Sequence, residues 1–339
     1  MSTGAGTCCL DCRLETGGCG YKEPTTCTDP KKMACPSAAP KDTNQDDLKL
    51  WPRDDRRRIL HAVYRVGDIE KTMKWMQDCL GMQILRKRDV PEEKYMNVFM
   101  GYGAEDNHFA AELTYNYGVS KYDIGTAFGH FGISTPNVQK SLDNMKKLGY
   151  KAPAGPTKDG NNVFAYVDDP DGYKFKFIQR SKSTREPFCQ VSYRVADVDR
   201  SILFYQDAYG MKLIARRDFP AQKKTMAYVA YDLDETRGTV VEFEYNYGKT
   251  DYSKGTGYAQ LAIGTEDVFK TAGACELGGG KTVRAPGPLP QIGTKIYGVN
   301  DPDGWKTVWV DNSDFAKELE PSAFVHEVHC TTANQRQHS

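Results

Sequence analysis

Four pairs of residues recur along the sequence at a nearly constant spacing, and seven of their eight members have metal-binding or acid–base potential. The pairs are His61 and Glu112, His130 and Lys176, Gln190 and Glu242, and Gln260 and Val308, separated by 51, 46, 52 and 48 residues. The first member is always His or Gln, and two of the second members are Glu. Imidazole, amide oxygen and carboxylate are suitable ligands for a borderline divalent ion. Two such pairs on facing strands would together supply four ligands.

A purely structural interpretation of these residues competes with a metal site. A single His on a strand is more often a hydrogen-bonded core residue than a ligand. A Glu at the centre of a strand is rarer in a core, because an unpaired buried carboxylate is very costly. Since polar residues stand at both positions in three of the four pairs, the sequence favours a real site, present or ancestral.

An internal repeat explains the regular spacing. The segments 64–91 and 193–220 match each other, as do 112–135 and 242–265, with an offset of 129 to 130 residues. We therefore predict two fused copies of one domain, at residues 57–180 and 187–312, joined by the short polar linker "RSKSTREP". Residues 1–50 are predicted to be a disordered Cys-rich tail, and residues 313–339 a C-terminal tail.

Each copy itself contains two similar modules. "HAVYRV" alternates like a half-buried strand. The following helix carries Ile69, Met73, Met76 and Leu80 at helical spacing, and Gly81 is its expected end. Three further strands follow before the pattern restarts at "GHFGIS". The chain is therefore predicted to be α+β, with four βαβββ modules in two tandem domains. Curved, mostly antiparallel sheets with outer helices would leave a concave face for a site.

Composition narrows the partners and the location. The formal net charge is zero, so electrostatics gives no reason to expect a nucleic acid or an anionic membrane as partner. No apolar run has the length of a membrane-spanning helix, and the N-terminus has no signal-like apolar region. A plastid transit peptide is poorly supported, because the first 45 residues contain several acids and little Arg. These features predict a cytoplasmic protein.

Six of the ten cysteines lie within the first 35 residues. Cys9 and Cys12 form a C-x-x-C motif that would suit zinc or a disulfide, but a structural zinc site needs a second pair at regular spacing. The other cysteines are scattered, as in a reducing compartment.

Several motifs closely resemble the two-domain, plant-type glyoxalase I, or lactoylglutathione lyase. They include "LHAVYRVGD", "LRKRDVPEEKY", "ELTYNYG", "YDIGTAFGHFGIS", "DPDGYKF", "QVSYRVADVDRSI", "YAQLAIGTEDVFKT", "PGPLP" and "DPDGWK", and they span about residues 50–320. The resemblance implies the vicinal-oxygen-chelate fold and isomerisation of the methylglyoxal–glutathione hemithioacetal to S-lactoylglutathione. It also implies a divalent metal, chiefly zinc or nickel, with magnesium and manganese as further candidates, and glutathione as cosubstrate.

The resemblance further implies which residues act together. Each site forms between the two domains. The working site would combine His130, Gln190 and Glu242 as metal ligands with position 176, and Lys176 and Glu242 would be its catalytic residues. The second pocket would combine His61, Glu112 and Gln260 with position 308. The residues implied to contact glutathione are Arg194 and Asn246 in the working site, and Arg65 and Asn116 in the second pocket.

Lys176 departs from this family pattern, which has Glu there as metal ligand and proton carrier. A lysine would weaken metal binding, swing away or lose its proton. From this we predict a divergent metal-dependent isomerase or lyase that abstracts an alpha proton from another reactive carbonyl compound in specialised metabolism, with ordinary glyoxalase I activity weak or lost. The first alternative is a genuine lactoylglutathione lyase. The second is a non-catalytic homologue that binds glutathione conjugates or metal. The domain fusion predicts a monomer.

Overall fold

The structure is a computed structural model, and it describes residues 44–180, 184–290 and 292–320. The cysteine motif at Cys9 and Cys12 lies outside this range. The first domain contains β1 (Arg58–Arg65), α2 (Ile69–Trp75), η1 (Met76–Leu80), β2 (Gln83–Val90), η2 (Pro91–Glu93), β3 (Tyr95–Gly101), β4 (Ala110–Asn116), β5 (Phe128–Thr135), α3 (Val138–Lys147), β6 (Thr157–Asp159), β7 (Asn162–Asp168) and β8 (Lys174–Gln179).

The second domain repeats this order of elements. It contains β9 (Phe188–Arg194), α4 (Val198–Asp207), β10 (Lys212–Phe219), η3 (Pro220–Gln222), β11 (Lys224–Ala230), β12 (Val240–Asn246), β13 (Tyr258–Thr265), α5 (Val268–Leu277), β14 (Lys281–Pro288), β15 (Lys295–Asn300) and β16 (Lys306–Asp311). The four βαβββ modules predicted from the sequence are therefore present.

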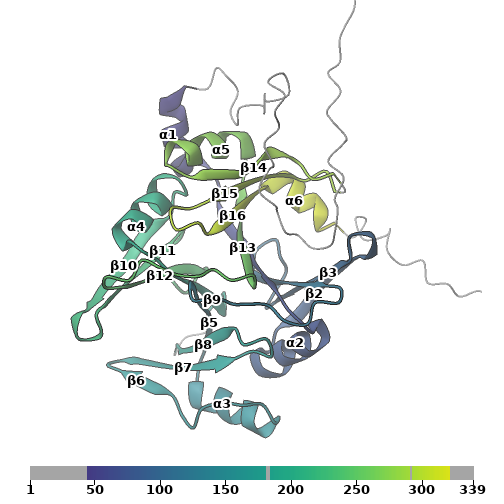
Figure 1. Ribbon diagram of the computed structural model, residues 1–339, viewed down its shortest axis with the longest axis vertical. Coiled ribbons are helices and arrows are strands. Elements are labelled where there is room, and N and C mark those ends of the chain that lie inside the picture. Colours follow the sequence, from purple (N-terminus) through teal and green to yellow (C-terminus); the bar gives the residue numbers. More distant parts are fainter. Residues whose placement is uncertain (1–43, 181–183, 291, 321–339) are drawn as a thin grey trace, which may run out of the picture.

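Two further helices correct the predicted tails. The N-terminal tail was expected to reach residue 50, but Gln45–Asp54 form α1, which begins with the Asn44 side chain accepting from Asp46 N–H. The C-terminal tail was expected from residue 313, but Asn312–Glu318 form α6, capped by Asp311. Figure 1 shows α1 beside α5 at one end of the molecule. Both segments are short, and their stability depends on packing that their own sequence does not reveal.

Local sequence signals start and stop the helix of each module. A side chain at the N-cap accepts a hydrogen bond from a backbone N–H in the first turn, and the four caps are Asp68, Asn137, Asp197 and Asp267. The first helix passes from α2 into a π-helical turn and ends at Gly81, whose φ of 72° is easily adopted without a Cβ. Ile69, Met73 and Met76 are buried, as their spacing predicted.

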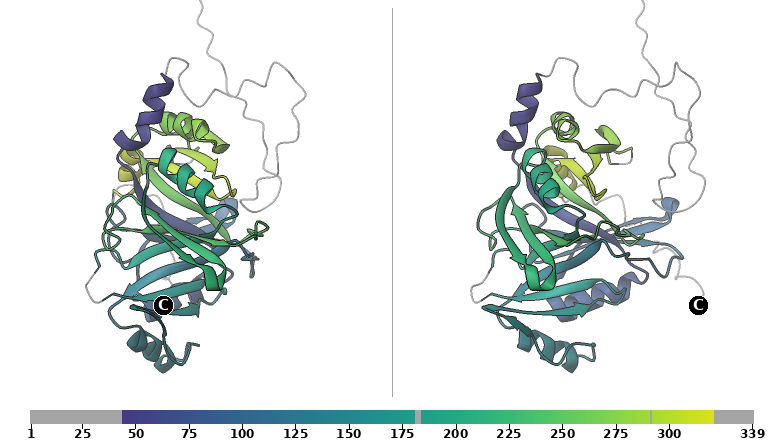
Figure 2. Two further views of the ribbon diagram at one scale, coloured as in Figure 1. Left: turned by 90° about the vertical axis from the view of Figure 1, so that its left-hand side faces the viewer. Right: turned by 60° about the vertical axis from the view of Figure 1, so that its left-hand side comes forward.

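The modules pair across the two domains rather than within one. Sheet A has the strand order β14-β15-β16-β13-β1-β4-β3-β2, so it joins the first and last modules. Sheet B has the order β10-β11-β12-β9-β5-β8-β7-β6, so it joins the two middle modules. The central contacts, β1 with β13 and β5 with β9, are antiparallel. Both sheets are mixed and curved, and the two views in Figure 2 show helices on their outer sides.

Modules of one domain are joined by the two "DPDG" turns instead of by strands. Asp169 accepts hydrogen bonds from the backbone N–H groups of Asp171 and Tyr173, which fixes the first turn. Asp171 then accepts from Gly67 N–H and from the Thr72 hydroxyl, at the start of the helix of the other module. Asp301 and Asp303 make the equivalent contacts in the second domain. These turns therefore fasten each domain together beside its last strand.

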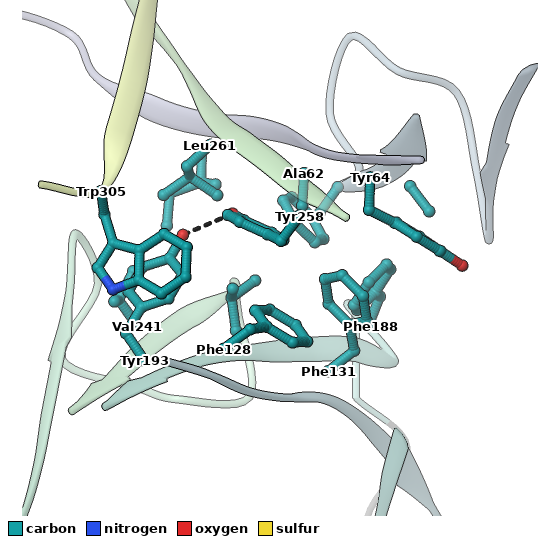
Figure 3. Close-up of a cluster of buried hydrophobic side chains, with 14 of the residues drawn as sticks. Ala62, Tyr64, Phe128, Phe131, Phe188, Tyr193, Val241, Tyr258, Leu261 and Trp305 are labelled. Carbon is teal, nitrogen blue, oxygen red and sulfur yellow. Dashed lines mark hydrogen bonds between the residues drawn. The ribbon is translucent and has the colours of Figure 1, made fainter. Parts of the chain in front are cut away.

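An aromatic core lies between the central strands of the two sheets (Figure 3). Tyr64 and Tyr258 come from sheet A, and Phe131 and Tyr193 come from sheet B. The hydroxyls of Tyr193 and Tyr258 are 2.5 Å apart, so these buried polar atoms satisfy each other. Because side chains alternate along a strand, the intervening residues of the same strands face away from this core. Those opposite faces are where the candidate chemistry lies.

Candidate active site

The register of sheet B places the predicted polar residues on one face. Ser192 of β9 pairs with His130 of β5 and with Glu242 of β12. Gly132 pairs with both Gln190 and Lys176, which brings β8 to the same group. Directly paired residues project to the same side of a sheet. The four strands come from both domains, two from each, so neither domain alone would assemble this group.

Glu242 is the centre of the group. Its carboxylate is fully buried and accepts hydrogen bonds from the Ser192 hydroxyl at 2.8 Å and from the Gln190 side-chain amide. Burial by itself raises the pKa of Glu242, but the nearby His130 and Lys176 and the two hydrogen bonds outweigh it, so the pKa lies below its ordinary value. Glu242 is therefore held as a carboxylate.

His130 provides a free ring nitrogen beside this carboxylate. Its Nε2 lies 3.6 Å from Glu242 Oε1, is buried, and has no hydrogen-bond partner in the structure. Burial lowers the pKa of His130 to about 4, even though Glu242 opposes that shift. The imidazole is therefore uncharged near neutral pH, which is the form that donates an electron pair to a metal. Lys176 is then the cation that faces Glu242.

Lys176 points into the site rather than away from it. Its Nζ lies 3.8 Å from Glu242 Oε2, and 16% of its side chain is exposed. The ammonium also lies 5.2 Å from the centre of the Phe164 ring and 5.8 Å from that of Tyr166, so aromatic faces line its other side. Of the alternatives left open by the sequence, a lysine that swings away does not match this position of Nζ.

The residues implied to bind glutathione lie farther along the same strands. Arg194 is two positions after Ser192 and forms an ion pair with Glu244 at 3.0 Å, and Asn246 donates to the same carboxylate. Arg194 also donates to the backbone carbonyls of Thr126 and Phe128. The structure thus brings Arg194 and Asn246 together at one end of the sheet B group.

Sheet A carries a counterpart, here called the sheet A pocket, formed by His61, Glu112, Gln260 and Val308. His61 Nε2 lies 3.1 Å from Glu112 Oε2, and Gln260 and Glu112 flank Val63 on neighbouring strands. Arg65 donates to the Thr256 carbonyl at the same end of β1. Its predicted companion Asn116 donates to the Tyr122 hydroxyl.

Helix α6 covers the sheet A pocket. The Phe315 ring lies 6.3 Å from that of His61 and is buried against Val308, Val310 and Ile296. In the sheet B site, Tyr166 beside Lys176 is 42% exposed. The central polar groups are nevertheless enclosed in both places: the side chains of His130 and Glu242 are 6% and 0% exposed, and those of His61 and Glu112 are 10% and 12% exposed.

Three side chains of the sheet B site escaped prediction from the sequence. Ser192 holds the Glu242 carboxylate, Tyr228 pairs with Glu242 on β11, and Tyr166 pairs with Lys176 on β7. Burial first, and the charge of Glu242 second, raise the pKa of Tyr228. Strand alternation would have placed Ser192 on the face of Gln190, since the two are separated by two positions. Tyr228 and Tyr166 could not be found in this way, because their pairing across strands depends on the strand register, which cannot be read from the sequence.

Comparison with known proteins identifies the family. The model of the glyoxalase/bleomycin resistance protein/dioxygenase superfamily matches residues 58–177 and 188–308. The chain belongs to this superfamily, and the predicted resemblance to the two-domain plant-type glyoxalase I is confirmed.

Relatives and solved structures agree on the kind of protein it is similar to. An Arabidopsis thaliana protein named as a probable chloroplastic lactoylglutathione lyase is 57% identical over 280 residues, covering 82% of this chain and 79% of the relative. A lactoylglutathione lyase of Oryza sativa subsp. japonica is 56% identical over 277 residues, covering 80% and 94%. The crystal structure of glyoxalase I from Zea mays is 56% identical, with a TM-score of 0.77 and coverage of 80% and 98%.

These findings correct one prediction. The sequence favoured a divergent isomerase of specialised metabolism with weak or lost glyoxalase I activity. Relatives that are 52–57% identical over about four fifths of the chain are instead named lactoylglutathione lyases, and the similar solved structures are glyoxalase I. That prediction was wrong, because it gave the single substitution at Lys176 more weight than the many matching motifs. The alternative of a genuine lactoylglutathione lyase is the better supported one.

Proposed function

We propose that this chain is a lactoylglutathione lyase that converts the hemithioacetal of methylglyoxal and glutathione into S-lactoylglutathione. The observation that carries the proposal is the buried Glu242 carboxylate, held by Ser192 and Gln190 on the face of sheet B that points away from the aromatic core. Relatives of 52–57% identity that carry this name support the same activity. The reaction moves a proton between adjacent carbons and needs a placed base and stabilisation of the enediolate oxygens.

The side chains of the sheet B site have distinct roles in this proposal. Glu242 removes the proton from the carbon that bears the hydroxyl and the glutathione sulfur and returns it to the neighbouring carbon. Lys176, 3.8 Å from that carboxylate, places a positive charge where the enediolate oxygen develops. Tyr166 and Phe164 border the same region and limit access of water to the carbanion carbon. Ser192 keeps the carboxylate in one orientation between the two transfers.

A divalent metal fits three positions of the site. In the described part of the chain no three His, Cys, Asp or Glu side chains converge on a point that would hold a metal, so an amide ligand is required. Gln190 supplies that amide, Glu242 an anionic oxygen, and His130 a buried nitrogen without a partner. A bound zinc or nickel ion, or magnesium or manganese, would polarise the carbonyl group of the substrate. Rotation of the Gln190 amide by half a turn presents its oxygen instead of its nitrogen.

Arg194 and Asn246 are the proposed contacts for glutathione. Both lie on the site face, at the end of the strands that carry Gln190 and Glu242. A guanidinium can bind a carboxylate of the tripeptide through two parallel hydrogen bonds. Because Arg194 already holds Glu244, the glutathione carboxylate shares or replaces that partner.

A matched pair of variants tests the activity and its location. Glu242→Gln in sheet B and Glu112→Gln in sheet A remove the same charge from equivalent positions. We expect Glu242→Gln to lower kcat for the hemithioacetal by about 100-fold to 10,000-fold, the usual contribution of a general base, while Glu112→Gln stays within about threefold of the unmodified enzyme. Formation of the thioester product is followed by ultraviolet absorbance. The reverse pattern would place the reaction in the sheet A pocket, and no turnover by the unmodified protein would refute the function.

The monomeric state and the cytoplasmic location stay proposals. Each sheet already combines strands of both domains, so no second chain is needed to complete the sheet B site. Size-exclusion chromatography with light scattering is expected to give the 38.0 kDa mass of one chain. No helix in the described ranges has the length and apolarity to cross a bilayer. The Arabidopsis relative is named as chloroplastic, so location has to be determined by imaging a tagged full-length protein.

A further inference from the structure

Of the four residues that the sequence assigned to the working site, Lys176 is the one that is not proposed as a metal ligand. Its ammonium is 3.8 Å from Glu242 Oε2, on the opposite oxygen from the one nearest His130. The carboxylate is completely buried, and the lysine is partly buried. A charge pair at this distance is weakly screened by solvent, because little water separates the two groups.

The local charge balance is complete without a metal. Glu242 contributes one negative charge and Lys176 one positive charge, while the Gln190 amide and the Ser192 hydroxyl that bond to Glu242 are neutral. The next charges along the face, Arg194 and Glu244, form an ion pair of their own. A divalent ion would therefore bring two positive charges that nothing described at the site compensates.

We propose that the Lys176 ammonium pairs with the Glu242 carboxylate when no metal is bound and competes with the metal for that carboxylate. The inference rests on the proposed metal site of His130, Gln190 and Glu242. Metal binding requires Nζ to leave Glu242, and the rings of Phe164 and Tyr166 offer the ammonium another position. The lysine thus makes the affinity for the ion weak.

Metal affinity, rather than catalysis, tests this inference. Full-length protein is stripped with a chelator and titrated with nickel and with zinc in competition with a chromophoric indicator. We expect Lys176→Met to bind nickel at least about 100-fold more tightly than the unmodified protein, equivalent to ~2.8 kcal/mol. Lys176→Gln serves as a second neutral variant if the methionine variant folds poorly. Lys174→Met is the matched control, because Lys174 lies two residues away with its side chain 54% exposed; its affinity should stay within about threefold.

A double variant assigns the effect to this site. The C-x-x-C motif at the N-terminus is a second candidate zinc site and is the same in every variant. The decisive comparison is therefore between Lys176→Met and the double variant Lys176→Met/His130→Ala, which shows how much of the gain in affinity depends on His130. A gain that disappears in the double variant supports the inference. Equal affinities in the unmodified protein and in both neutral variants overturn it, as does a gain that survives loss of His130. Those failures are distinct from failure of the proposed function, which the Glu242→Gln turnover measurement decides.

Discussion

We predict that the turn before β8 holds this strand of the sheet B site in place. Asp171 Oδ1 accepts the Gly67 N–H at 2.7 Å, and Oδ2 accepts the Thr72 hydroxyl at 2.8 Å. Thr72 is completely buried, so its hydroxyl has no water to replace the carboxylate. Replacing Asp171 by Ala removes both bonds and loosens the only side-chain link described here between this turn and α2.

The size of the effect follows from these two bonds. Hydrogen bonds to a charged group contribute roughly 1.5–3 kcal/mol each, and we take the lower value because the turn is partly exposed and water can enter after the substitution. The unfolding free energy of Asp171→Ala should then fall by about 3 kcal/mol. Because β8 starts at Lys174 directly after the turn, kcat of the lyase reaction should fall as well.

Urea unfolding followed by circular dichroism measures the loss. Asp168→Ala is the control, since Asp168 belongs to the same segment but pairs with Lys174 on the surface, where the two side chains are 56% and 54% exposed. An exposed pair of this kind should contribute below about 1 kcal/mol. If Asp171→Ala and Asp168→Ala lose the same stability, the turn does not fasten the modules and the reasoning is refuted.

Three further predictions follow from particular contacts. Phe315→Ala should open the sheet A pocket and speed hydrogen exchange in α6, because the Phe315 side chain is buried there at 5% exposure. Lyase turnover should stay within about twofold if the reaction occurs in sheet B. A large loss of turnover would contradict that location. Arg194→Ala should raise KM for the hemithioacetal by about tenfold or more, and Arg65→Ala should raise it much less. Steady-state kinetics measures both values. Equal effects of the two substitutions would argue against Arg194 as the glutathione contact. Burial raises the pKa of Asp169 to about 8. Between about pH 4 and pH 8 the folded state therefore keeps a proton on Asp169 that the unfolded state has released. The unfolding free energy should fall as pH rises through this range. Asp169→Asn should flatten this dependence in urea titrations at several pH values, and an unchanged slope would count against the assignment.

The fold was largely predictable because the repeat is visible in the sequence. Matching segments about 130 residues apart defined the domains, and the switch between strand and helix periodicity defined the modules. Which modules share a sheet was not predictable from periodicity. Alternation tells which face of a strand a residue such as Glu242 occupies, but the neighbouring strand is chosen by non-local pairing. Only the family resemblance indicated that the two domains form each site together.

The orientation of individual side chains was the less predictable part of the site. The sequence left open whether Lys176 enters the site, because a long flexible side chain can reach several places from one Cα position. Ser192 was overlooked because a hydroxyl gives no chemical signal until its partner across the sheet is known. Similarly, α6 is too short for its own sequence to predict that Phe315 packs on His61.

The two sheets show how one backbone arrangement supports two different pockets. Equivalent positions in the strand registers carry Tyr228 in sheet B but Phe99 in sheet A, and Lys176 in sheet B but Val308 in sheet A. In sheet A, Val308, Val310 and Ile296 form an apolar surface on which Phe315 packs, although His61 Nδ1 in the same pocket is buried without a hydrogen-bond partner. The equivalent position of sheet B carries the ammonium of Lys176, which an apolar ring packed on it would have to desolvate further.

The difference between positions 176 and 308 therefore separates the two pockets chemically. In sheet A, Val308 belongs to the apolar cluster that holds Phe315. In sheet B, Lys176 faces the Glu242 carboxylate, which is completely buried and is also held by Ser192 and Gln190. A fully buried carboxylate held by several polar groups is the arrangement expected of a positioned base, and this is why the proposed chemistry is assigned to sheet B rather than to its counterpart.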